Sequence, residues 1–484
     1  MNHKVIRYIL GCVLKIEAVF ILVPCIVALA YRETEGLAYL ATSGLCLAAG
    51  FLIGGKKPEK FVFYLREGCI STSLSWIFMS IFGCLPFIFT GEIPSFTDAL
   101  FETVSGFTTT GASILSEVES LSMASNMWRS FSHWLGGMGV LVFLLAVVPL
   151  GGGSRINLMK AESPGPSVGK LVPRVAYTAR ILYVIYLGIT VLEMIFLLIG
   201  GMSLYEAVAT SFATAGTGGF GIKNDSIGGY SAYIQWVTTV FMILFGVNFN
   251  AYYYIIFKNI KKAFKMEEVR YYFLIIFIAI GIIACSIFKT TSGIEEALRQ
   301  ASFQVASIIT TTGFSTVDFE AWSGTCKTVL VILMFVGACA GSTGGGIKVS
   351  RFIILIKTMI KELNSYIHPK SIKKIKIEGK PIDHEVVRSV NVYIITFVLI
   401  FVLSIFAISF NGYDLITNFT AVTATINNIG PGLELVGPSQ NFGHFSVFSK
   451  YVLIFDMLAG RLELFPLLLL FHPSIWKGTI SKKK

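Results

Sequence analysis

FETVSGFTTTGAS at residues 101–113 and FQVASIITTTGFS at residues 303–315 align without a gap. Two further segments resemble them: residues 205–218 read YEAVATSFATAGTG, and residues 419–432 read FTAVTATINNIGPG. The copy at 205–218 needs one extra residue to bring Gly216 into line with Gly111, and the copy at 419–432 has the same length as that copy. The copies recur about every hundred residues, which is typical of an internal repeat. The sequence therefore predicts four related structural units.

The composition places these units in a membrane. Hydrophobic residues make up 54% of the 484 residues and charged residues only 14%, and the mean hydropathy is +0.72. A soluble domain carries about a quarter charged residues, so a soluble enzyme, a disordered protein and a disulfide scaffold are excluded. The net charge of +11 comes from short basic blocks between apolar stretches, a pattern that argues against binding to nucleic acid.

Ten apolar runs are long enough to cross about 30 Å of hydrocarbon. They lie near residues 8–31, 36–54, 69–90, 127–150, 179–199, 232–257, 271–288, 328–347, 390–410 and 447–470. The connector after every even-numbered run is rich in Lys and Arg, and the chain ends in three lysines, whereas the opposite connectors hold few basic residues. Because positive charge is retained on the cytoplasmic side, we expect these connectors and both termini in the cytoplasm.

The four repeated segments are too short to cross the membrane, so we expect each to enter from the outside as a short helix and turn back. Irregular backbone at that depth is tolerated only where protein buries it or water fills a cavity. Glycine can adopt positive φ, which lets successive carbonyl groups point the same way, and the partly negative ends of the short helices would face the same axis. Four such loops around one axis predict rings of carbonyl oxygens that replace the hydration shell of a cation.

The residues expected to bind the ion are the following: Thr109, Thr110, Gly111, Thr214, Ala215, Gly216, Thr311, Thr312, Gly313, Asn428, Ile429 and Gly430. The alternative is that Thr and Gly only punctuate loops and pack helices. Four aligned copies on the same side of the membrane favour the ring.

We therefore expect an all-α integral membrane protein. Four pseudo-symmetric units, each made of a helix, a pore helix, a filter loop and a second helix, would surround one pore and follow two extra transmembrane helices. The expected boundaries are residues 1–66 for the N-terminal helix pair, 67–174, 175–269 and 270–386 for the first three units, and 387–484 for the fourth unit and a cytoplasmic tail.

At these residues the sequence resembles the Trk/Ktr/HKT superfamily of potassium transporters, and most closely its bacterial Trk-type membrane subunits. Besides the four loops, the resemblance includes REG at residues 66–68, DALFE at 98–102, the Gly-rich stretch at 337–348 and GRLE at 460–463. It implies potassium uptake across the bacterial cytoplasmic membrane, no cofactor, a homodimer with one ion path per subunit, and a cytosolic TrkA-type nucleotide-binding partner. In this family a Ser at the first filter glycine often accompanies sodium permeation, so Gly111 favours potassium.

Residues 337–346, GACAGSTGGG, lie inside the eighth apolar run. Each interior glycine costs a helix about 1 kcal/mol, so we expect an irregular segment here. The functional interpretation is a flexible loop beneath the filter that blocks or clears the path, with its glycines as the gating residues: Gly337, Gly341, Gly344, Gly345 and Gly346. The alternative is close helix packing through small residues, and the resemblance favours the gate.

Arg461 lies inside the last apolar run, where a charged side chain costs roughly 2.5 kcal/mol or more. We expect it to face the path below the filter and to repel cations until the loop moves. The alternative is an ion pair with Glu463 or Asp456, although Glu463 is only two residues away and would lie on another face of the helix.

Three further polar residues receive weaker assignments. Asp98 and Glu102 lie where negative charge favours a helix N-terminus and could enrich cations at the mouth, with capping as the favoured role of Asp98. His133 is interpreted as a hydrogen-bonded histidine at the membrane interface, not as a metal ligand.

Other functions remain as alternatives. A Ktr-like or less selective potassium and sodium transporter is the nearest. An integral-membrane enzyme is disfavoured because the six histidines form no H-E-x-x-H motif. A sodium-coupled transporter with inverted repeats is disfavoured because the four copies run parallel. The Lys-rich connector at 351–388 and the tail are expected to meet either a cytosolic partner or anionic membrane lipid.

Overall fold

The computed structural model describes all residues except 1, 56–57, 59–63, 140–174, 370–373 and 477–484. The described residues are helical apart from irregular loops and one small hairpin, β1 (Lys376–Ile377) and β2 (Lys380–Pro381). The all-α fold is as expected. Many of the basic residues that indicated the cytoplasmic side, among them those of the connector after residue 150 and the last three lysines, lie outside the described residues.

The chain begins with a helical hairpin made of α1 (His3–Phe20), α2 (Leu22–Tyr31) and α3 (Gly36–Gly54). Gly11 of α1 lies so close to Gly50 and Gly54 of α3 that a side chain there would overlap their backbone. Small residues allow this approach in membranes, where van der Waals packing drives helix association.

Four successive groups of helices follow, each with a long helix, a short helix and a second helix. The first group has α4 (Leu65–Gly83), α5 (Leu85–Thr90), α6 (Phe96–Phe107) and α7 (Met123–Met138). The second has α10 (Val175–Ile199), α11 (Leu204–Gly216), α12 (Ala232–Phe245), α13 (Phe249–Ile256) and α14 (Ile260–Lys265). The third has α15 (Glu267–Ile287), α16 (Ile294–Ile309), η1 (Phe319–Ala321), α17 (Gly324–Phe335) and α18 (Val349–Ile367). The fourth has α19 (His384–Ile408), η2 (Ser409–Asn411), α20 (Leu415–Ile426), η3 (Glu434–Val436), α21 (Val447–Arg461), α22 (Phe465–Leu469) and α23 (Pro473–Trp476).

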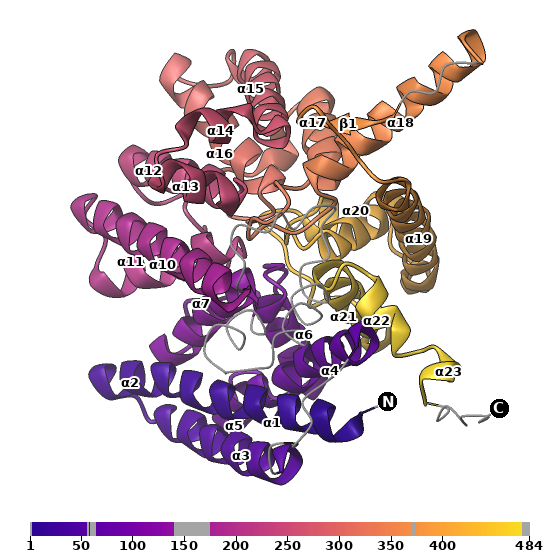
Figure 1. The fold of residues 1–484 in the computed structure, drawn as a ribbon. Coiled ribbons are helices and arrows are strands. Elements are labelled where there is room, and N and C mark those ends of the chain that lie inside the picture. The colour runs from indigo at the N-terminus through magenta and orange to yellow at the C-terminus, as the bar shows by residue number, and fades with distance from the viewer. Residues whose placement is uncertain (1, 56–57, 59–63, 140–174, 370–373, 477–484) are drawn as a thin grey trace, which may run out of the picture.

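Figure 1 shows the four groups following one another in chain order around the middle of the molecule. The short helices α6, α11, α16 and α20 lie on the inside, and most of their residues are buried. Ser95, Ser203 and Asp414 cap three of these helices by accepting a hydrogen bond from a backbone amide of the first turn. Such caps satisfy amides that a helix leaves unpaired at its start. The three capping residues are exposed, so these helices begin at the surface and run inward.

Six helices among the described residues are long and apolar enough to cross a membrane, and they match the first, second and every later odd-numbered predicted run: His3–Tyr31, Gly36–Gly54, Leu65–Thr90, Ala179–Ile199, Glu267–Ile287 and His384–Ser409. The expectation of a continuous span is wrong for the sixth and tenth runs, whereas the eighth run is interrupted where its glycines predicted an irregular segment. The axis bends by 92° between α12 and α13, α17 ends at Phe335, and α21 ends at Arg461. The second half of the fourth run lies outside the described residues.

Backbone groups exposed by such a break need a partner inside a membrane protein. At the break after α12, the amide of Cys339 donates to the carbonyl of Gly246 at 3.1 Å. This partner is nearly a hundred residues away, and hydropathy along the sequence carries no information about it.

Candidate functional site

The four short helices end in the same way. Each is followed by one residue with left-handed backbone, and the amide after it donates to the carbonyl five positions earlier at 2.8 to 2.9 Å. The left-handed residues are Thr109 (φ 55°), Thr217 (55°), Thr311 (59°) and Asn428 (55°). Two positions later comes a glycine that is also left-handed: Gly111 (φ 77°), Gly219 (77°), Gly313 (84°) or Gly430 (100°). This is a Schellman-type helix end, and we call residues 109–111, 217–219, 311–313 and 428–430 the Gly loops.

The second Gly loop differs from the sequence prediction. Gly216 is the last residue of α11 and is not among the residues with positive φ. The expectation that Gly216 takes the left-handed backbone is therefore wrong, and residues 217–219 stand where Thr214, Ala215 and Gly216 were expected. The alignment matched one glycine with another, whereas the end of the helix, set by its hydrogen bonds, falls three residues later. Gly216 instead packs against the backbone of His133, where a side chain would not fit.

The four Gly loops touch one another in a closed ring. A methyl group added to Gly111 would overlap the carbonyl oxygen of Gly218, and one added to Gly219 would overlap that of Thr312. A methyl group on Gly313 would likewise overlap the carbonyl oxygen of Ile429. The ring closes at Gly430, where it would lie 2.8 Å from the carbonyl oxygen of Thr110. Each glycine thus makes room for a peptide oxygen of the next loop.

The backbone oxygens of the Gly loops accept no hydrogen bond from the described residues. Buried carbonyl groups in folded proteins nearly always have a partner, and leaving one unpaired is costly. The unpaired peptide oxygens of the four loops therefore form a polar surface that a cation can satisfy.

Side chains behind the ring hold the loops in place. The hydroxyl groups of Thr108 and Thr110 lie 2.8 Å apart, and those of Thr310 and Thr312 lie 2.7 Å apart. The amide of Asn428 donates to Thr110 Oγ1 and to the carbonyl of Met457, each at 2.9 Å. The fourth loop is thereby tied to the first loop and to α21.

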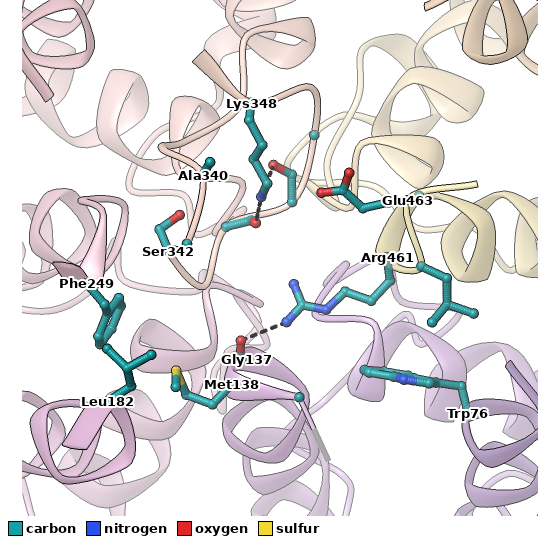
Figure 2. Close-up of a pocket in the computed structure, with 17 residues that line it drawn as sticks. Trp76, Gly137, Met138, Leu182, Phe249, Ala340, Ser342, Lys348, Arg461 and Glu463 are labelled. Atoms are coloured by element: carbon teal, nitrogen blue, oxygen red, sulfur yellow. Dashed lines mark hydrogen bonds between the residues drawn. The ribbon is translucent and has the colours of Figure 1, made fainter. Parts of the chain in front are cut away.

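Cavities lie on both sides of the ring. The four glycines of the Gly loops, together with polar residues such as Lys223 and Asn224, line one cavity of ≈ 140 Å³. Another cavity of ≈ 140 Å³ is lined by the glycine-rich stretch between α17 and α18 and by the end of α21 (Figure 2). The ring of peptide oxygens thus separates two cavities. We call the cavity lined by the four glycines the upper cavity and the cavity beside the glycine-rich stretch the lower cavity.

The glycine-rich stretch is irregular, as expected, because no helix occupies residues 336–348. We call these residues the Gly-rich loop, and it contains all five predicted gating glycines. Its base is closed where the amide of Gly337 donates to the carbonyl of Ile347 at 2.8 Å. Its C-terminal half contacts the third Gly loop, since the amide of Gly345 donates to Thr311 Oγ1 at 2.6 Å. The loop therefore lies directly against the ring.

Arg461 points across the lower cavity (Figure 2). Its guanidinium donates to the carbonyls of Gly136, Gly137 (2.8 Å) and Thr343 (2.9 Å), so it joins α7 to the Gly-rich loop. Glu463 is paired with Arg351. The side chain does lie below the ring, but α21 ends at Arg461 and does not continue past it. The helix stops because Glu463 and Leu464 adopt left-handed backbone.

Two residues of this region were missed by the sequence analysis. Lys348 folds back so that its ammonium group donates to the carbonyls of Gly344 and Gly345 (Figure 2). Glu268, at the start of α15, accepts hydrogen bonds from the amides of Ala340 (2.6 Å) and Ser350 (3.1 Å). One carboxylate thus joins the first half of the Gly-rich loop to the start of α18. In the sequence Glu268 looks like an ordinary acidic residue in the first turn of a helix, and no local signal distinguishes it.

We expect the Glu268→Ala substitution to loosen the Gly-rich loop. It removes the acceptor of two backbone amides, and hydrogen bonds to a charged group are worth about 1.5–3 kcal/mol each. Hydrogen exchange followed by mass spectrometry should become faster by roughly tenfold or more in peptides covering residues 337–350. Glu267→Ala is the matched control, because Glu267 pairs with Lys357 and with the amide of Glu378. Equal exchange in both variants would show that Glu268 does not hold the loop.

The weaker sequence assignments have mixed outcomes. Ser95, and not Asp98, caps α6, and Asp98 pairs with Lys450 at 2.6 Å. Glu102 is buried and paired with Arg129, so it does not present its charge at the mouth as expected. His133 is fully buried and hydrogen-bonded at both ring nitrogens; it is a satisfied histidine, as expected, but lies in the interior and not at the membrane interface.

Comparison with known proteins gives consistent results. A family model described as "TrkH: Cation transport protein" matches residues 42–478. The chain is 35% identical over 485 residues to the Trk system potassium uptake protein TrkH of Escherichia coli K12, with 99% of this chain and all of that protein covered. It is 32% identical to TrkG of the same organism, with 98% and 99% covered.

A solved structure is also similar. The crystal structure of the potassium transporter TrkH from Vibrio parahaemolyticus superimposes with a TM-score of 0.89 at 32% identity, with 99% of this chain and 100% of that chain covered. These relatives are transporters and not enzymes, which removes the membrane-enzyme alternative. The matches extend over nearly the whole length on both sides, and the chain therefore belongs to the TrkH family of cation transport proteins.

Proposed function

We propose that this protein takes up potassium across the bacterial cytoplasmic membrane and that its four Gly loops form the selectivity filter. The relatives are named as potassium uptake proteins. The observation that carries the filter is the closed ring of loops whose peptide oxygens have no hydrogen-bond donor among the described residues. The ion-binding residues would be those of the Gly loops, including Thr217, Gly218 and Gly219 in the second loop. No cofactor is needed, because peptide oxygens alone replace the water around the ion.

The filter should discriminate less sharply than that of a potassium channel. Each loop has one glycine that all four share, and the fourth loop contains Asn428 and Pro431 where the others have Thr and a different residue. Fewer equivalent carbonyl rings give fewer binding sites. A potassium-preferring path with some sodium permeation is therefore the nearest alternative, and it differs from the main proposal only in degree.

We further propose that the Gly-rich loop and Arg461 close the path below the filter. The loop contacts the third Gly loop through Gly345 and Thr311, and Arg461 holds it through the carbonyl of Thr343. A positive charge in the cavity raises the energy of a second cation there. Movement of the loop would release Arg461 and clear the cavity.

Regulation would come from the cytoplasmic side. The described part of the Lys-rich connector includes α18, which extends away from the body in Figure 1, and the β1–β2 hairpin. Because α18 begins directly after the Gly-rich loop, force on this helix reaches the gate. We propose that a cytosolic TrkA-type nucleotide-binding subunit acts here, that the protein forms a homodimer, and that both termini are cytoplasmic. The Lys-rich surface would also meet anionic lipid.

Growth rescue tests the proposed function. A bacterium lacking potassium uptake, supplied with this protein and its partner, should grow at low potassium. Gly111→Ser removes the left-handed glycine of the first loop and should lower the ratio of potassium to sodium uptake by about tenfold, because a dehydrated ion senses the field of every carbonyl ring. Failure of the wild-type protein to rescue growth would contradict potassium uptake, and an unchanged ratio in Gly111→Ser would contradict the filter.

A further inference from the structure

A buried ion pair lies directly behind the first two Gly loops. Glu102 is on α6 and Arg129 on α7, and Arg129 Nε lies 2.9 Å from Glu102 Oε1. Their side chains are 0% and 2% exposed. A charged pair this deeply buried is expensive to desolvate, so its presence calls for a specific role.

Glu102 binds the residues that immediately follow the first Gly loop. Its carboxylate accepts hydrogen bonds from Ser113 Oγ at 3.0 Å and from the amide of Ile114 at 3.0 Å. These residues follow Gly111 by two and three positions. The carboxylate thereby fixes the direction in which the chain leaves the ring.

Arg129 binds the residues that immediately follow the second Gly loop. Its Nη1 donates to the carbonyl of Gly221 at 3.2 Å, two positions after Gly219. The guanidinium also lies over the ring of Phe220, with its carbon 4.2 Å from the ring centroid. Because guanidinium is planar and makes several hydrogen bonds in fixed directions, it sets the distance between the two loops.

His133 lies one helical turn further along α7 and also links the first unit to the second Gly loop. Its Nδ1 is 2.8 Å from the carbonyl of Gly106 on α6, and its Nε2 accepts from the amide of Phe220 at 3.2 Å. Residues four apart on a helix lie on one face. One face of α7 therefore joins the end of α6 to the second Gly loop.

The third and fourth units hold the residues after their Gly loops through neutral groups. In the third unit, Gln304 stands nine residues before its loop glycine, as Glu102 does, and its amide lies 3.5 Å from Thr316 Oγ1 and from the carbonyl of Val317. In the fourth unit, Thr420 accepts from the amide of Leu433 at 3.0 Å. The contact behind the first Gly loop is thus charge-assisted, and it is stronger than the neutral contacts in the third and fourth units.

We propose that Glu102 and Arg129 are positioning residues that set potassium selectivity by holding the first and second Gly loops at a fixed spacing. This inference rests on the filter proposed above. Selection between two cations of equal charge depends on the number and field of the oxygens around the ion, and both change if one junction of the ring widens. The ion pair also affects the charge of the upper cavity, through which cations would enter. Arg129 lines the upper cavity, and Glu102 neutralises a charge that would otherwise repel entering cations.

The test is the Glu102→Gln/Arg129→Gln double variant, purified and reconstituted in liposomes. It removes both charges together, which avoids the unpaired buried charge that each single variant would leave, and the two amides can still hydrogen-bond. The ratio of potassium to sodium flux is expected to fall by about tenfold, with the fold retained as judged by the thermal unfolding midpoint. A purely structural role would lower that midpoint and leave the ratio unchanged.

Two companion variants make the result interpretable. The Glu267→Gln/Lys357→Gln variant removes an ion pair from the cytoplasmic side and should leave the ratio at the wild-type value. Gly111→Ser reports on the filter itself. If Gly111→Ser lowers the ratio and the Glu102/Arg129 variant does not, the positioning role is refuted while the filter stands. If neither variant changes the ratio, the filter and the inference built on it both fail. If the double variant does not fold, Glu102→Asp, which keeps the charge and shortens the reach, should lower the ratio alone, and a wild-type ratio there would refute the role.

Discussion

Gly219→Ala is expected to reduce potassium uptake by on the order of 100-fold. Left-handed backbone costs a residue with a side chain roughly 1–2 kcal/mol, and Gly219 has φ 77°. The added methyl group would also overlap the carbonyl oxygen of Thr312 in the next loop, and overpacking of this kind costs typically about 1–3 kcal/mol. The loop must therefore move, and the ring of oxygens opens at that junction. Rubidium uptake into proteoliposomes measures the effect.

Gly188→Ala is the matched control for this substitution. Gly188 lies in α10, and a side chain there would meet no atom within 4 Å. Its uptake should stay close to that of the wild type. Wild-type uptake by a well-folded Gly219→Ala protein would show that the second Gly loop does not line the ion path.

Arg461→Gln is expected to raise basal potassium flux, measured without the cytosolic partner, by about tenfold or more. At an effective dielectric constant near 20, two unit charges 4 Å apart repel by about 4 kcal/mol, and the energy falls inversely with distance. A glutamine removes this repulsion and keeps at most part of the hydrogen bonding to Gly137 and Thr343. Loss of the repulsion and loss of the hydrogen bonds both favour an open lower cavity, so both should increase the flux.

Lys450→Gln is the control for the loss of a positive charge from the same helix. Lys450 is at the other end of α21 and pairs with Asp98. Its removal should leave basal flux unchanged. If Arg461→Gln and Lys450→Gln have the same flux as the wild type, Arg461 has no part in closing the path.

The first, third and fourth Gly loops could be located from the sequence because each one combines a strong local signal with a fixed distance from its helix. Three consecutive threonines precede Gly111 and Gly313, and Gly430 follows two asparagines and an isoleucine. In the second copy three glycines, Gly216, Gly218 and Gly219, follow one another within four residues. The sequence offers no way to decide which of them ends the helix, because that depends on which backbone hydrogen bonds form.

The Gly-rich loop could be predicted from the sequence, but most of the residues that hold it in place could not. Five glycines inside an apolar run predicted an irregular loop, because glycine lowers helix stability wherever it occurs. The residues that hold the loop, Glu268 and Arg461 among them, act through hydrogen bonds to carbonyls and amides of other segments. Only Arg461 was conspicuous, since a charge inside an apolar run is costly, whereas Glu268 at a helix start is commonplace.

The sequence by itself determined the membrane class, the long apolar helices and the fourfold repetition, because hydropathy and composition act along the chain. Tertiary structure alone decided where the second loop begins, where the later helices break, and that Glu102 faces Arg129 and not the solvent. Each of these depends on a buried backbone or charged group finding a partner on a distant segment, and the cost of leaving such a group unpaired is felt only once the helices have packed.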